Sequence, residues 1–98
     1  MSWELSFHSK ALKEFHKLDN SIKAQFRIRL ERLMAHAAGP DSELGGELSG
    51  WQKIKLRKHG YRLVYFRDPA QRVIRVIAVG RRDEGVYQNA IIRLDREI

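Results

Sequence analysis

The sequence predicts an α+β protein, a small antiparallel sheet with an N-terminal helical hairpin packed on one face and a C-terminal helix. Apolar residues recur at helical spacing in two segments near the N-terminus, alternate with polar residues between 51 and 80, and return to helical spacing near the end. The expected element order is β-α-α-β-β-β-α. A chain of 98 residues supports one modest core, so we expect one domain over residues 1–98.

The first expected elements are a strand over residues 2–8 and a short helix. The segment Trp3-Glu4-Leu5-Ser6-Phe7 alternates apolar and polar residues, as half-buried strands do. Ser9 is the expected N-cap of the helix. The apolar face of that helix would hold Ala11, Leu12, Phe15 and Leu18, and its solvent face would hold Lys10, Lys13, Glu14 and Lys17.

A second helix is expected to begin at the capping sequence Asp19-Asn20-Ser21 and to end at Gly39-Pro40. Its apolar stripe is Ile22, Phe26, Leu30 and Leu33. Residues 39–50 are rich in turn-forming and acidic residues, which indicates a loop, anchored by Leu44 and Leu48.

Three strands are expected next, over residues 51–57, 61–67 and 72–80. Turn sequences at 58–60 and 68–71 separate them, which predicts an antiparallel meander. The final helix is expected over residues 84–96, because its apolar residues recur at i, i+3, i+4 and i+7 as Tyr87, Ala90, Ile91 and Leu94.

Composition excludes several classes of protein. The chain has no cysteine, which excludes disulfides, thiolate metal sites and cysteine nucleophiles. No stretch reaches signal-peptide or membrane-span character, so we expect a cytoplasmic protein that does not enter a membrane. Residues 1–50 hold seven basic and seven acidic side chains, whereas residues 51–98 hold twelve and five. The whole net charge of +7 therefore lies in the second half, where it favours a polyanionic partner.

The candidate site is the basic face of the expected sheet. In the strand 51–57, Lys53, Lys55 and Arg57 alternate with Ile54 and Leu56 and so share one face. Arg62 follows the next turn, the pair Arg81-Arg82 ends the third strand, and Tyr87 starts the last helix. Such a face could hold a nucleotide, with the cations on phosphate and the ring stacked on a base.

RNA cleavage by its own 2′-hydroxyl needs a base, stabilisation of the transition-state charge, and protonation of the leaving 5′-oxygen. Arg62 and Arg82 suit the second task. A lysine acts as a base only when its pKa is lowered, and the juxtaposition of Lys53 and Lys55 supplies that condition.

Each of these residues also has a simpler interpretation. A basic strand face is more typical of a solvated or phosphate-binding surface, and an aromatic residue at a helix start more often packs on the sheet. His59 in a turn and Glu84 at a helix N-terminus are minor candidates for proton transfer. The remaining histidines form no metal-ligand spacing and are expected at the surface: His8, His16 and His36.

The same segments resemble the RelE branch of the RelE/ParE toxin superfamily along nearly the whole chain. The most specific parts are Leu48-Ser49-Gly50 before 53–57, then Gly60-Tyr61-Arg62-Leu63-Val64-Tyr65, then Val79-Gly80-Arg81-Arg82 with Tyr87. Residues 11–14 and 17–18 also look like the family. The stretch 83–86 is one residue shorter than the family pattern.

The resemblance implies a toxin of a type II toxin–antitoxin system that cuts mRNA in the ribosomal A site and is inhibited by a cognate antitoxin. By this resemblance Lys55 corresponds to the general base and Lys53 to its supporting cation. Arg62 stabilises the transition state, Arg82 assists the leaving group, and Tyr87 stacks on an mRNA base. Arg57 and Arg81 are the expected phosphate-binding residues.

The charge asymmetry and the detachable position of the last helix lead to the hypothesis that an acidic or amphipathic segment of the antitoxin covers the basic sheet or displaces that helix. No metal or other cofactor is expected, and operator DNA would be bound only through the antitoxin. Two alternatives stay open: a ParE-like inhibitor of DNA gyrase, and a non-enzymatic basic nucleic-acid-binding or co-repressor module.

Overall fold

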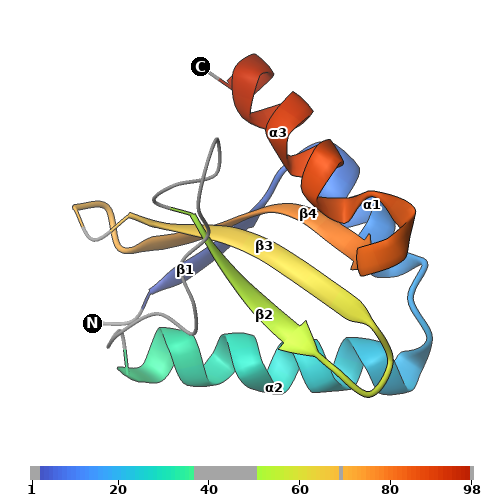
Figure 1. Ribbon diagram of the computed structural model, residues 1–98. Coiled ribbons are helices and arrows are strands. Elements are labelled where there is room, and N and C mark those ends of the chain that lie inside the picture. Colours follow the sequence, from blue (N-terminus) through green and yellow to red (C-terminus); the bar gives the residue numbers. More distant parts are fainter. Residues whose placement is uncertain (1–2, 37–50, 69, 98) are drawn as a thin grey trace.

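The computed structural model describes residues 3–36, 51–68 and 70–97, and it confirms the predicted fold class and element order. The second N-terminal helix and the C-terminal helix lie on opposite sides of a four-stranded sheet (Figure 1). The first N-terminal helix shares its apolar core with the second. The elements are β1 (Glu4–Phe7), α1 (Ser9–His16), α2 (Asn20–His36), β2 (Gln52–Leu56), β3 (Tyr61–Asp68), β4 (Val73–Arg81), the 3-10 helix η2 (Arg82–Glu84) and α3 (Val86–Glu97).

The sheet has the strand order β1-β4-β3-β2. Strands β2, β3 and β4 form the predicted antiparallel meander. The expectation of a wholly antiparallel sheet was wrong for β1, which pairs with β4 in parallel, Glu4 opposite Val73 and Phe7 opposite Val76. The parallel pairing follows from the two helices that separate β1 from the meander, because a connection of that length can return the chain in the same direction.

Each face of the sheet carries its own apolar core. The helical hairpin covers one face with the predicted stripe of α2 and with Ala11, Phe15 and Leu18, whereas Leu12, predicted on the same apolar face, is exposed. The sheet residues of this core are Ile54, Leu56, Leu63, Tyr65, Ile74, Val76 and Val79. Helix α3 covers part of the other face, where the buried cluster is Val64, Ile77, Ala78, Val86 and Ala90. Because α3 packs mainly over β4 and β3, the β2 side of this second face keeps its polar side chains.

A bulge in β4 changes which residues face α3. Val64 pairs with Ala78 and Tyr65 pairs with Val76, so Ile77 has no partner in β3. An extra residue of this kind shifts the alternation of side chains along the strand. Ile77 and Ala78 therefore both pack under α3, whereas Val76 and Val79 face the hairpin.

Three local expectations were wrong. The N-cap of α1 is His8, whose Nδ1 accepts a hydrogen bond of 3.1 Å from the Lys10 backbone N–H, and Ser9 is already helical. Glu14 does not lie on a solvent face, since its carboxylate accepts hydrogen bonds from the Val79 backbone and from Arg93.

The last helix begins at Val86 and not at residue 84. Gly85 has a φ of 83° and ends the 3-10 turn that precedes α3, so one continuous helix cannot form there.

The predicted end of the second helix at 39–40 and the loop over residues 39–50, with Leu44 and Leu48, lie outside the described residues. Within the described ranges, no helix combines the length and apolar character that crossing a bilayer requires.

Candidate active site

A row of side chains crosses three strands on the face that α3 partly covers. Lys55 on β2 lies opposite Arg62 on β3, and Arg62 lies opposite Gly80 on β4. Residues directly opposite each other on neighbouring strands share a face of the sheet. The two cations of this row are therefore neighbours, and Val86, the first residue of α3, lies beside Gly80.

A second row runs one step along the strands. Lys53 lies opposite Val64, and Val64 lies opposite Ala78. The apolar part of this row supports α3, which brings the Tyr87 ring over the β2 side of the sheet. The Lys53 ammonium nitrogen lies 5.7 Å from the centroid of that ring, within the range of a cation–π interaction.

The row of Lys55 and Arg62 continues into a hollow of about 400 Å³ at the end of the sheet, lined by Arg57, Gly60, Arg62, Arg81, Arg82 and Asp83. A backbone hydrogen bond of 2.8 Å from Arg82 N–H to Gly60 C=O joins the β2–β3 turn to the end of β4. This bond places Arg82 beside Arg62, although twenty residues separate them. An open, cationic hollow of this kind suits a phosphate group.

Arg62 is the most enclosed cation of this surface. Its exposed fraction is 8%, and its guanidinium donates a hydrogen bond of 2.9 Å to the Tyr61 carbonyl oxygen. A guanidinium fixed by the backbone holds its remaining N–H groups in one direction. Such preorganised donors stabilise developing negative charge more than mobile ones do.

Lys53 has the environment that lowers the pKa of a lysine, as a lysine that accepts a proton near neutral pH requires. Burial lowers the pKa of Lys53 below its ordinary value of 10.5, and repulsion from Lys55, Arg62 and Arg82 lowers it further. The same repulsion shows that the four cations lie within electrostatic range of one another. With Tyr87, these are the five residues for which the sequence predicted a catalytic role, and the structure brings them together.

The two predicted phosphate-binding arginines differ in their surroundings. Arg57 is exposed at the rim of the hollow. Arg81 lies 5.7 Å from the centroid of the Tyr61 ring and 3.3 Å from the Asp83 carboxylate. Hydrogen bonding to Asp83 raises the pKa of Arg81. Arg81 thus contacts Tyr61 and Asp83 at the edge of the hollow, whereas the exposed side chain of Arg57 is better placed to bind a phosphate.

The minor candidates lie outside this cluster. His59 is exposed in the β2–β3 turn, and Glu84 lies 3.9 Å from Arg81 on an exposed 3-10 turn. In the described part of the chain, no group of three or more His, Asp or Glu residues is arranged to hold a metal ion.

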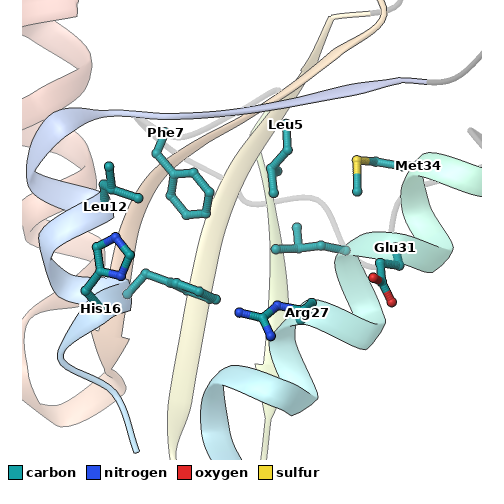
Figure 2. Close-up of a pocket in the computed structure, with 9 residues that line it drawn as sticks. Leu5, Phe7, Leu12, His16, Arg27, Glu31 and Met34 are labelled. Atoms are coloured by element: carbon teal, nitrogen blue, oxygen red, sulfur yellow. The ribbon is translucent and has the colours of Figure 1, made fainter. Parts of the chain in front are cut away.

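A second hollow, of about 330 Å³, lies on the other side of the molecule between β1, α1 and α2 (Figure 2). Figure 2 shows Leu5, Phe7, Leu12 and Met34 pointing into it, with His16, Arg27 and Glu31 around them. Its lining is mainly apolar, so it lacks the row of cations that a phosphate backbone requires. The basic face is therefore the candidate active site.

A family model described as the ParE toxin of the type II toxin–antitoxin system parDE matches residues 5–85. A RelE-like toxin protein of Escherichia coli is 39% identical over 95 residues, covering 96% of this chain and 99% of the relative. The chain belongs to the RelE branch of the RelE/ParE toxin superfamily. The mRNA interferase toxin RelE of E. coli strain K12 is 36% identical with the same coverage.

Solved structures agree with membership of the RelE branch. A doubly substituted variant of E. coli toxin RelE in the free state has a TM-score of 0.79 at 35% identity, covering 96% of this chain and 99% of that one. The toxin in the intact E. coli RelBE toxin–antitoxin complex has a TM-score of 0.73 at 35% identity, with 81% and 95% covered. The RelE fold is thus shared over nearly the whole chain.

Sequence reasoning missed two residues that connect α1, β4 and α3, Glu14 and Arg93. Glu14 resembled a solvent-facing residue, and Arg93 lies among alternating polar and apolar positions of an amphipathic helix. One signal was available in the sequence. Arg93 follows Val86 and Ala90 at helical spacing, so it falls on the buried stripe of the last helix, where an arginine needs an acidic partner such as Glu14.

Proposed function

We propose that this RelE-family chain is the toxin of a type II toxin–antitoxin system and cleaves mRNA in the ribosomal A site. The observation that carries the proposal is the convergence of Lys53, Lys55, Arg62 and Arg82 with Tyr87 on one open face. The similarity to the mRNA interferase toxin RelE of E. coli supports mRNA as the substrate. One domain over residues 1–98 would carry the activity.

The reaction would begin when a lysine removes the proton from a 2′-hydroxyl. The resulting oxyanion attacks the adjacent phosphorus, the bond from phosphorus to the 5′-oxygen breaks, and the products end in a 2′,3′-cyclic phosphate and a 5′-hydroxyl. Arg62 would stabilise the charge on the phosphoryl oxygens, because it is held in place by the Tyr61 carbonyl. Arg82 would donate hydrogen bonds to the leaving 5′-oxygen, which takes up a proton from water to become the 5′-hydroxyl.

The lysines would share the first step. The family resemblance assigns the base to Lys55, and its position opposite Arg62 favours that assignment. Lys53 has the lowered pKa, caused first by burial and then by the neighbouring cations. We propose that Lys55 is the base and that Lys53, beneath Tyr87, is its supporting cation.

Dependence on the ribosome follows from the chemistry of these residues. A lysine base and arginine donors are weak acid–base catalysts near neutral pH, so most of the rate enhancement has to come from holding the 2′-hydroxyl in line with the phosphate. On this proposal, the ribosome would hold the A-site mRNA in the conformation that cleavage needs. Free RNA is flexible, so we expect it to be cut poorly.

The proposed partner is a cognate antitoxin. The E. coli RelBE complex is a toxin–antitoxin assembly of this fold, and the basic face of this chain would attract an acidic segment. Operator DNA would be bound only through the antitoxin. A protein that acts on translating ribosomes would work in the cytoplasm.

Inhibition of DNA gyrase is the second candidate, because the matching family model is described as a ParE toxin. That model ends at residue 85, before Tyr87 and α3. A gyrase inhibitor would have no need for the lysine–arginine face. Retained toxicity after Lys55→Ala and Arg82→Ala would favour this candidate.

The testing experiment is primer extension on an mRNA in a purified translation system. Wild type is compared with Arg82→Ala and with a reaction that lacks ribosomes. We expect cleavage within A-site codons that requires both ribosomes and Arg82. Intact mRNA in all reactions would overturn the nuclease proposal, and the supercoiling of relaxed DNA by gyrase would then be assayed.

A further inference from the structure

Glu14 on α1 and Arg93 on α3 form a forked ion pair at the edge of the sheet. One guanidinium nitrogen lies 2.8 Å from Oε1 and the other lies 2.7 Å from Oε2. The side-chain exposures are 26% for Glu14 and 10% for Arg93. Two parallel charge-assisted hydrogen bonds of this length fix both side chains in distance and in orientation.

The Glu14–Arg93 pair is anchored to the backbone of β4. Glu14 Oε1 accepts a hydrogen bond of 3.1 Å from the Val79 N–H, and Arg93 donates one of 3.0 Å to the Ile77 carbonyl. Strand β1 pairs with β4 only as far as Val76, and Ile77 is the bulge residue without a partner in β3. The pair therefore satisfies backbone groups that the sheet leaves unpaired.

Arg93 occupies the sheet-facing stripe of α3. Val86, Ala90 and Arg93 follow one another at helical spacing, and all three are buried. The apolar side chains that attach the helix, among them Ala90, Ile91 and Leu94, make contacts without a preferred direction, which leave its tilt and rotation less fixed. The forked pair at Arg93 adds directional contacts, and directional contacts set the angle at which a helix crosses a sheet.

We propose that Glu14 and Arg93 are positioning residues that hold α3 at the angle which places Tyr87 against Lys53. Tyr87 and Arg93 are six residues apart, roughly 9 Å along the same rigid helix. A change of tilt at the Arg93 end therefore moves the Tyr87 ring relative to the cations of β2. The proposal rests on the proposed function where it makes this ring the contact for an mRNA base.

The test uses the full chain with Arg93→Met, Arg93→Lys and Glu14→Gln. Lys13→Met is the matched control, since it also removes a cation but from the exposed neighbour of Glu14. Hydrogen exchange is measured on the amides of α3 and of β3. Nuclear Overhauser contacts are measured between the Tyr87 ring and the Lys53 side chain.

For Arg93→Met, we expect exchange in α3 to rise roughly 100-fold while exchange in β3 rises less than about tenfold. The Tyr87–Lys53 contacts should be lost. Arg93→Lys should restore part of both, because lysine keeps the charge without the fork. Lys13→Met should match wild type. Equal acceleration in α3 and β3, or unchanged Tyr87–Lys53 contacts in Arg93→Met, would overturn the positioning role.

Single-turnover cleavage on programmed ribosomes gives the functional readout. We expect Arg93→Met to lower the cleavage rate roughly tenfold to 100-fold with the apparent KM for ribosomes within about threefold of wild type. A change in KM alone would contradict positioning. If wild type cuts no mRNA, the proposed function fails, while the exchange and contact measurements still decide whether the pair positions α3.

Discussion

The Lys53 ammonium nitrogen lies 5.7 Å from the centroid of the Tyr87 ring. The two residues are far apart in the sequence and come from different layers, β2 of the sheet and α3 above it. Their contact places an aromatic ring at the border of a face that also holds Lys55 and Arg62. A nucleotide stacked on that ring would therefore have its phosphate within reach of the cations.

Replacement of Tyr87 separates stacking from hydrogen bonding. Tyr87→Phe keeps the ring and should retain cleavage within about threefold of wild type. Tyr87→Ala removes a contact worth roughly 1–3 kcal/mol per stacked base, so cleavage should fall roughly tenfold to 100-fold. Single-turnover cleavage on programmed ribosomes measures both, and equal activity of the two variants would argue against stacking.

Lys53→Met should make the protein more stable at neutral pH while lowering its activity. Lys53 binds a proton less readily in the folded protein than in the unfolded chain, because burial and three neighbouring cations lower its pKa below 10.5. Unfolding therefore takes up protons, and wild-type stability rises with pH through the interval between the lowered pKa and 10.5. Below that interval the repulsion is fully present.

Thermal unfolding measures the effect of Lys53→Met. We expect a Tm roughly 1–3 °C higher at pH 7, a small gain because the site is open to solvent and salt. The gain should shrink toward pH 10 and in roughly 0.5 M salt. A lower Tm at pH 7 with an unchanged fold would contradict the repulsion.

Arg62→Lys should abolish most of the activity without unfolding the protein. Lysine keeps the charge but cannot bond the Tyr61 carbonyl and a phosphate in the same fixed geometry. We expect a loss of roughly 100-fold or more in cleavage rate. Arg32→Lys, on the exposed side of α2, is the control and should leave the rate unchanged.

Two glycines next to the site should respond oppositely to alanine. Gly85 has a φ of 83°, and a side chain there strains the backbone by roughly 1–2 kcal/mol, so Gly85→Ala should lower Tm by about 5 °C or more. Gly80 has no such φ, and an added Cβ would make an ordinary 3.8 Å contact with Val86. Gly80→Ala should therefore keep or raise Tm, as thermal unfolding can show.

The sequence predicted the elements well because each one has a local signal. The stripe of Ile22, Phe26, Leu30 and Leu33 is buried as expected, and the three strands of the meander pair as predicted. The basic face could also be predicted, since alternation along β2 places Lys53 and Lys55 on one face of the sheet and Ile54 and Leu56 on the other. These features depend on period and turn chemistry alone.

The errors that bear on the site concern contacts that only the assembled sheet creates. Glu14 was expected in solvent because its neighbours in α1 are lysines. In the structure, β1 ends before it reaches Val79 of β4, and the Glu14 carboxylate accepts a hydrogen bond from the Val79 N–H. The bulge at Ile77, which gives Arg93 its acceptor, has no local sequence signal. The contact of Tyr87 with Lys53 likewise depends on how α3 crosses the sheet.

The central claim is that this basic face cuts RNA through the RNA's own 2′-hydroxyl. The most direct test is an mRNA with a single 2′-deoxy nucleotide immediately 5′ of the cleaved phosphate in the A-site codon, presented on programmed ribosomes. The account predicts that wild-type protein leaves this message intact while cutting the matched all-ribose message to a 2′,3′-cyclic phosphate. Cleavage of the 2′-deoxy message at the same bond and a similar rate would contradict it.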